Sequence, residues 1–196
     1  MPNHDPGVVE EVARIICDER VIDYRAAKRK AAERLGLPPN FPLPDNATIH
    51  AAVIEYQRLF GGEAYALQLQ RMRKAALSAC RLFAHYSPRV VGATISGAVT
   101  SAHRVQIHLF CDSAEMIDIE LINRRIAFDQ GERNYRYANG RDISIPLLCL
   151  DIDGQGVDAA VFGEHELRQA PINPLDGQRF KRIDAAELEQ LLHSGP

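Results

Sequence analysis

The sequence predicts an α/β protein in which an N-terminal helical region is followed by a mixed β-sheet with flanking helices. Two observations carry this prediction. Apolar residues recur at helical spacing through residues 1–86, whereas short apolar and alternating segments typical of strands follow from Pro88 onward. The alternation is clearest in V-Q-I-H-L-F, residues 105–110, where valine, isoleucine and leucine would face a core. We therefore divide the chain into a helical region, residues 1–86, and an α/β region, residues 87–196.

Helices are expected throughout the first region. One begins at Pro6 and carries valines and isoleucines spaced three and four residues apart. A second spans about residues 24–35 and ends at a glycine, followed by a proline-rich connector. A third, at about residues 48–60, stops at a glycine pair. A fourth covers about residues 63–86.

The second region alternates strands, turns and helices. A short apolar strand at residues 89–91 leads into a turn of small residues, and the alternating strand comes next. Ser113 is a plausible cap for a helix over residues 113–123. The remaining expected elements share weaker patterns: a short strand at 135–137, a hairpin of strands 143–153 and 156–163 around an Asp-Gly turn, and a final helix at 185–192.

Composition narrows the function classes. A net charge of −3 gives no overall electrostatic case for binding nucleic acid or membranes. No apolar stretch approaches the roughly 20 residues that span a bilayer, and no signal peptide is evident. The four cysteines are scattered without a C-x-x-C pair, which favours reduced thiols over disulfides or zinc. We expect a cytoplasmic protein.

The segment of residues 89–110 says most about function. Gly92 and Gly97 bracket the turn of small residues, and the strand after it presents Arg104, Gln106 and His108 on one face. Strand, glycine turn and polar strand resemble the nucleotidyltransferase superfamily that includes DNA polymerase β. In that family a G-[GS] turn precedes a strand with D-x-D or D-x-E. The resemblance implies a nucleotidyltransferase-like mixed sheet.

The catalytic carboxylates of that family are replaced here. Nucleotidyl transfer typically uses two Mg²⁺ ions held by three carboxylates, two at i and i+2 on one strand and one on its neighbour. Gly92 and Ala93 take the G-S position, but Arg104 and Gln106 stand where the two aspartates would be. Asp158, in V-D-A-A-V-F, matches the third acid and is the candidate catalytic residue.

The resemblance also implies a nucleotide-binding surface without a metal. A guanidinium repels Mg²⁺, so Arg104 would pair with a phosphate or with Asp158. No metal site is therefore expected, and Mg²⁺ would be a cofactor only if a carboxylate such as Asp112 stood in for the missing ligands. The candidate nucleotide-binding residues are Gly92, Ala93, Thr94, Ser96, Gly97, Arg104, Gln106 and His108.

A second resemblance covers more of the chain. It rests on D-Y-R-A-A-K-R-K-A-A-E-R-L-G-L-P, L-P-D-N, G-A-T-I-S-G, H-L-F-C-D and P-L-D-G-Q. These segments look like a group of small, uncharacterised bacterial proteins described at most as nucleotidyltransferase-like. Such relatives carry S-D-I-H where this chain has residues 103–106, H-R-V-Q. The comparison implies that even their single aspartate is absent here.

Three functions remain open from the sequence. The first is a catalytically impaired nucleotidyltransferase-fold protein that binds a nucleotide or another phosphorylated ligand. The second is an active metal-dependent transferase with unorthodox ligands. The third is a protein-interaction module, for example one half of a toxin–antitoxin-like pair, in which the fold serves only as a surface. The basic run at residues 28–34 faintly suggests DNA binding, but such runs are usually solvated helix faces, so a nucleic-acid partner is not expected.

Overall fold

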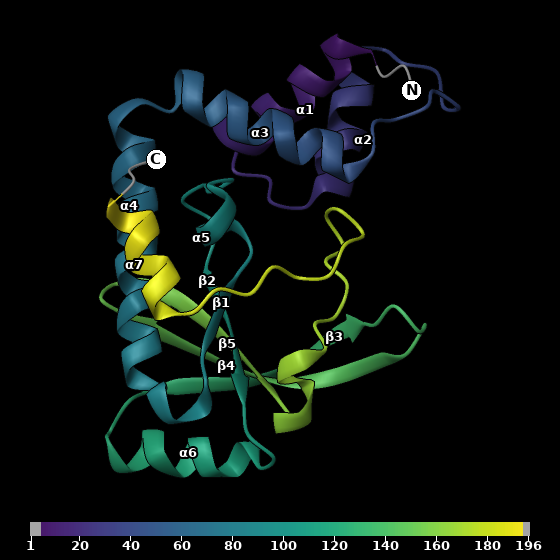
Figure 1. Cartoon of the computed structure of the whole chain (residues 1–196). Coiled ribbons are helices and arrows are strands. Elements are labelled where there is room, and N and C mark those ends of the chain that lie inside the picture. The colour runs from purple at the N-terminus through teal and green to yellow at the C-terminus, as the bar shows by residue number, and fades with distance from the viewer. Residues whose placement is uncertain (1–4, 194–196) are drawn as a thin grey trace.

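The computed structural model describes residues 5–193 and has the predicted mixed α/β architecture, with N-terminal helices followed by a sheet (Figure 1). Residues 1–4 of the predicted helical region and residues 194–196 of the predicted α/β region lie outside the described residues. Within the described part of the chain, no helix combines the length and the apolar character needed to cross a membrane.

The first three helices begin at aspartates. Helices α1 (Pro6–Asp18), α2 (Tyr24–Arg34) and α3 (Asn46–Phe60) follow Asp5, Asp23 and Asp45, respectively. Each aspartate side chain accepts a hydrogen bond from a backbone N–H of the first turn, at 2.7 to 3.2 Å. A capping bond of this kind satisfies a donor that the helix itself cannot pair, typically contributing about 1 kcal/mol.

These helices share one apolar core and are also joined by charge. Their core includes Val12, Ile16, Ala27, Ile49 and Val53, together with Ala98 from the second region. On the surface, two cations of the basic run on α2 hold it against α1: Lys30 and Arg34 both bind Glu19, and Arg34 also reaches Glu11. The carboxylates thus neutralise part of the run that suggested DNA binding.

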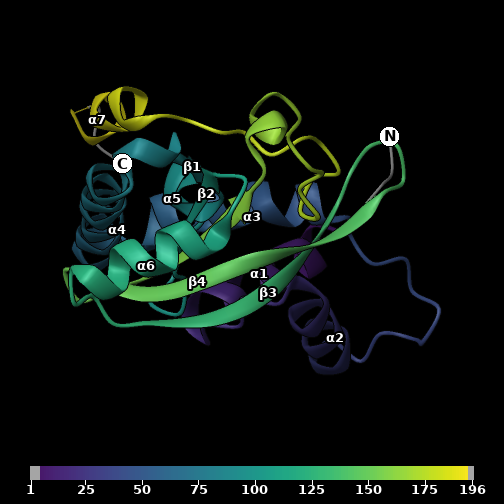
Figure 2. The same cartoon turned by 90° about the horizontal axis from the view of Figure 1, so that it is seen from below.

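The described strands form a sheet in the order β1-β2-β5-β4-β3. Strand β1 (Arg89–Val91) pairs antiparallel with β2 (Val105–Phe110), and β2 runs parallel to β5 (Gln155–Phe162). Strand β4 (Asp142–Ile152) pairs antiparallel with both β5 and β3 (Phe128–Arg136). Strands β3 and β4 form a long, twisted hairpin that leaves β3 at the sheet edge (Figure 2).

The two sheet faces have different coverings. Helix α4 (Gly62–Leu82) packs with α6 (Ala114–Asn123) and α7 (Ala185–His193) over one face, where Val105, Ile107 and Leu109 point into the main core. On the other face, a smaller aromatic core is closed by the 3₁₀ helix η2 (Glu164–Arg168) and by Phe180. The period-two alternation of β2 therefore separates two buried layers, and neither of them is a fully solvated face.

Several predicted boundaries differ from the structure. The short strand expected at residues 135–137 is the end of the nine-residue strand β3. The fourth helix stops at Leu82 and is followed by a 3₁₀ turn, η1 (Ala84–Tyr86). The small-residue turn contains a single helical turn, α5 (Ala93–Ser96), that the sequence did not indicate. The hairpin of β4 and β5 and the final helix lie where they were predicted.

Candidate functional site

The glycine turn is built so that only glycine fits at its two ends. Gly92 and Gly97 have φ angles of +73° and +84°, which L side chains rarely adopt. A Cβ on Gly92 would lie 3.1 Å from Oε1 of Gln106, so this turn and the side chain of Gln106 are in contact. A Cβ on Gly97 would lie 2.9 Å from the hydroxyl of Tyr65, which donates to the Gly97 carbonyl at 3.0 Å. The turn is thus fixed between β2 and α4.

Asp158 lies at the centre of a two-arginine cluster on the sheet. The β2–β5 register places it beside Gln106, as the resemblance implied for a third acid. Nε of Arg104 donates to its Oδ1 and Nη2 of Arg133 donates to its Oδ2, both at 2.6 Å. Nη2 of Arg104 also donates to the carbonyls of Leu150 and Val157, both at 3.2 Å. With Asp158 only 7% exposed, each carboxylate oxygen is engaged by a guanidinium.

This arrangement changes the role of Asp158. A carboxylate whose oxygens both bind arginines is a counterion and an anchor for those side chains, and it offers little to a cation. The pairing of Arg104 with Asp158 was one of the two alternatives expected from the sequence. Arg133 was missed, because it lies in the charged segment of β3 that carries no apolar alternation.

The structure buries His108 among aromatic side chains. It lies on the same sheet face as Gln106, as predicted, but it is only 1% exposed. Its ring packs against Phe162, Tyr135 and Phe180, with centroids 4.6 to 5.4 Å apart. Nε of Arg182 donates to its Nδ1 at 3.1 Å. Burial, and secondarily the charge of Arg182, hold the pKa of His108 well below its usual range. The expectation that His108 contacts a nucleotide is therefore corrected, because η2 and Phe180 cover this end of the sheet.

The turn residues are divided between core and surface. The side chain of Thr94 is buried, and its carbonyl accepts a bond from Nε of Arg73 at 3.3 Å, so the prediction that its hydroxyl reaches a ligand is corrected. Gly97 is buried as well, under Tyr65. Ala93 is half-buried, and Gly92 and Ser96 line a hollow.

This hollow, the glycine-turn hollow, has a volume of about 300 Å³. Two cations, Arg179 and Lys181, belong to its lining. Its other side chains come from α3, α5 and the loop of residues 173–181: His50, Ile95, Asn173, Leu175, Asp176 and Phe180, beside Gly92 and Ser96. The pKa of His50 is lowered by burial although Asp176 opposes the shift, so the imidazole is predominantly neutral near pH 7.

A second hollow, the α2 hollow, has a volume of about 920 Å³ and shares Leu175 with the first. Nζ of Lys28 donates to Oδ1 of Asn46 at 2.6 Å, and Nδ2 of Asn46 donates to the carbonyl of Pro174 at 3.0 Å. The hollow is lined by residues of α2, of its N-terminal approach and of two loops: Ile22, Asp23, Tyr24, Arg25, Ala26, Lys28, Arg29, Leu43, Asn46, Pro174 and Leu175.

The two hollows bring together segments that are distant in the chain. D-Y-R-A-A-K, L-P-D-N, G-A-T-I-S-G and P-L-D-G-Q, four of the segments that carry the second resemblance, each contribute to one hollow or both. The loop of residues 173–181 is the common wall.

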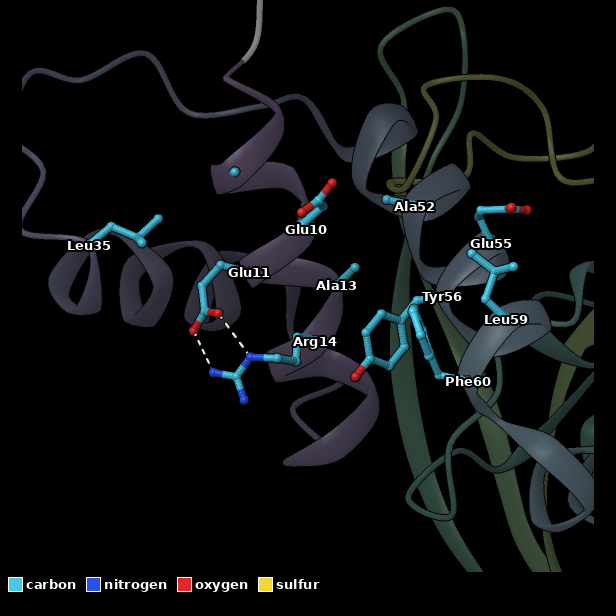
Figure 3. A pocket seen from close by; sticks show the side chains of 11 residues that line it. Glu10, Glu11, Ala13, Arg14, Leu35, Ala52, Glu55, Tyr56, Leu59 and Phe60 are labelled. Atoms are coloured by element: carbon cyan, nitrogen blue, oxygen red, sulfur yellow. Dashed lines mark hydrogen bonds and ion pairs between the residues drawn. The ribbon is translucent and has the colours of Figure 1, made fainter.

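A third cavity, of about 550 Å³, lies between α1 and α3 (Figure 3). Its walls include the apolar side chains of Leu35, Leu59 and Phe60. Its charged side chains are mainly carboxylates, and Arg14 binds Glu11 at 2.7 Å. This groove suits an apolar partner better than a phosphate.

The described part of the chain has no cluster of side chains suited to binding a metal ion. Within residues 5–193, no three histidine, cysteine or carboxylate side chains are grouped to hold an ion. Asp112 follows β2 at its far end, where its Oδ1 accepts from the backbone N–H of Glu164 at 3.0 Å. Asp158 pairs with Gln106, and β2 continues for four more residues, to Phe110, before the chain reaches Asp112. At about 3.3 Å per strand residue, Asp112 lies roughly 13 Å or more from Asp158. The two carboxylates cannot share an ion as the active-transferase alternative required.

Comparison of the chain with known protein families, with characterised proteins and with solved structures finds no match in any of the three.

Proposed function

We propose that this chain is a nucleotidyltransferase-fold protein that has lost metal-dependent catalysis and binds a nucleotide or another phosphorylated ligand in the cytoplasm. The observation that carries the proposal is the cluster of Arg104 and Arg133 around Asp158. Two guanidinium groups face one carboxylate, which leaves a positive charge where relatives of this type would bind Mg²⁺. That charge can meet the phosphates directly.

The surroundings of the cluster support the same ligand. Gln106 lies on the same sheet face as the cluster and touches Gly92, which lines the glycine-turn hollow. Arg179 and Lys181 add two cations to the lining of this hollow. Two cations thus line the hollow and two more bind Asp158, whose neighbour Gln106 touches the turn; in a protein whose overall charge is −3, these positive charges favour an anionic ligand.

The test is a thermal-shift measurement with ATP and other nucleotides in the absence of divalent metal. A ligand at 100 times its dissociation constant stabilises the fold by about 2.7 kcal/mol, which raises the Tm of a protein of this size by roughly 5–10 °C. Arg104→Glu should abolish the shift, because it replaces an attraction for phosphate with a repulsion. Each variant is compared with its own ligand-free Tm.

Arg136→Glu is the matched control. Arg136 lies three residues from Arg133 on β3, so it projects from the other side of the strand. Its variant should keep the full nucleotide shift, whereas Arg133→Met should lose most of it. If no nucleotide shifts the Tm of the native protein, with or without metal, the proposal is wrong. A shift that needs Mg²⁺ and disappears in Asp158→Ala would favour an active transferase.

A protein-interaction role is the second candidate. It is favoured by the groove between α1 and α3, where Leu59 and Phe60 are exposed beside a floor that includes Ala13 and Ala52 (Figure 3). Exposed apolar side chains around a hollow are typical of protein-contact surfaces. This role and ligand binding use different surfaces, so either can exist without the other.

A further inference from the structure

The basic run on α2 divides into two sets with different surroundings. Lys30 and Arg34 are bound to carboxylates of α1. Arg25 and Lys28 instead line the α2 hollow, where Asp23 is the acidic side chain nearest in sequence. That carboxylate accepts bonds from two backbone N–H groups of α2 and is thus engaged as a helix cap. The lining of this hollow thus carries three cations, Arg25, Lys28 and Arg29, against one carboxylate, and this excess of positive charge attracts an anion.

The α2 hollow also presents exposed apolar surface. Ile22 is 48% exposed and Leu43 is 38% exposed, and both belong to its lining. A cavity that offers cations beside apolar side chains suits a ligand with a phosphate and a flat apolar ring system. A nucleotide has both parts, whereas inorganic phosphate lacks the ring and a fatty acid lacks both the phosphate and the ring.

The two hollows are neighbours that share part of one wall. Leu175 lines both, and the hydroxyl of Tyr24 in the second is hydrogen-bonded to Nδ1 of His50 in the first, at 3.0 Å. The bond from Asn46 to the Pro174 carbonyl holds the common loop against α3. The loop of residues 173–181 therefore belongs to the walls of both hollows, and a ligand long enough to follow it would contact both.

We infer that the ligand is a dinucleotide or a longer phosphodiester, with its terminal phosphates at the glycine turn and its next nucleotide in the α2 hollow. In this arrangement Arg25 and Lys28 bind the linking phosphodiester, and Ile22 and Leu43 contact the second base. The inference rests on the proposed function, because it assigns the first phosphates to the cluster around Asp158. It extends that function by naming a substrate class of two or more linked nucleotides.

The experiment compares ATP with the 5′-triphosphorylated dinucleotide pppApA by calorimetric titration. The two probes carry the same triphosphate and differ by one linked adenylate, so their affinity ratio reports the second hollow alone. We expect pppApA to bind at least about tenfold more tightly. Arg25→Glu should remove this advantage and leave ATP affinity within about twofold. Arg25 is exposed, so the substitution leaves the core intact.

Arg71→Glu is the control for charge reversal. Arg71 is exposed on α4 and belongs to the lining of neither hollow, so both affinities should stay unchanged. Equal binding of ATP and pppApA, or an advantage that survives Arg25→Glu, would overturn the inference while leaving the proposed function in place. If neither probe binds the native protein, the proposed function fails and this inference fails with it.

Discussion

Replacing Asp158 with asparagine should separate the stability of the fold from its affinity for phosphate. The substitution keeps the shape and one acceptor oxygen but removes the charge that Arg104 and Arg133 share. Breaking a fully buried ion pair from one side costs about 3–5 kcal/mol. Here the arginine side chains are 43% and 33% exposed, and water screens part of the loss. The free energy of unfolding should therefore fall by about 2–3 kcal/mol.

Urea denaturation followed by circular dichroism measures this change. With a slope of about 2 kcal/mol per molar urea, the midpoint should drop by roughly 1–1.5 M. The double variant Asp158→Asn/Arg133→Met should cost less than the sum of the two single variants, because it also removes a guanidinium left without a counterion. A midpoint that moves by less than about 0.2 M would refute the assignment of Asp158 as the anchor of the cluster.

The same variant should bind ATP at least as well as the native protein. Asp158 competes with phosphate for the two guanidinium groups, so neutralising it leaves more positive charge for the ligand. A metal-binding aspartate would give the opposite result, since its loss would abolish binding. An affinity more than about tenfold weaker, in a variant that is still folded, would contradict the counterion role and support the sequence-based view of Asp158 as a catalytic residue.

Two further predictions concern metal and pH. Calorimetric titration with Mg²⁺ should show no site tighter than about 10⁻³ M, because both oxygens of Asp158 bind arginines; micromolar binding that Asp158→Ala abolishes would contradict this. His108 is buried with a lowered pKa, so the unfolded chain takes up its proton near pH 6.5 while the folded protein does not. Stability should thus be complete above about pH 6.5 and fall below it, by up to about 1.4 kcal/mol per pH unit for this residue. Urea midpoints between pH 7.5 and 5.5 should show a shallower decline in His108→Gln, and an unchanged slope would exclude this histidine as a cause.

The helices and the hairpin could be predicted because their signals are local. Apolar spacing, a proline at a helix start, glycines at helix ends and an Asp-Gly turn each act within a few residues. Strand β3 carries no such signal: D-Q-G-E-R-N is polar on both faces, and its backbone pairing with β4 makes it a strand. Arg133 was overlooked for that reason.

The site was harder to predict than the fold because distant segments complete it. Alternation along β2 correctly placed Gln106 and His108 on one face, but it could not show that Phe180, far along the chain, covers the histidine. Likewise, the loop of residues 173–181 forms the common wall of both hollows through Leu175, and no periodic pattern marks it. The one sequence signal for this loop was P-L-D-G-Q, residues 174–178, which is among the segments that carry the second resemblance.

Helix α4 sets where the chain can be divided. The sequence pattern suggested a boundary after residue 86, yet Leu69, Met72, Ala76 and Phe83 all belong to the main core beneath the sheet. A fragment beginning at residue 87 would expose to water the part of the apolar sheet face that α4 covers, and such a surface favours aggregation over folding. A cut near Gly61, between α3 and α4, would instead keep this core whole. Expression of residues 62–193 is thus the sensible starting point for separating the sheet from helices α1 to α3, two of which contribute to the walls of the hollows.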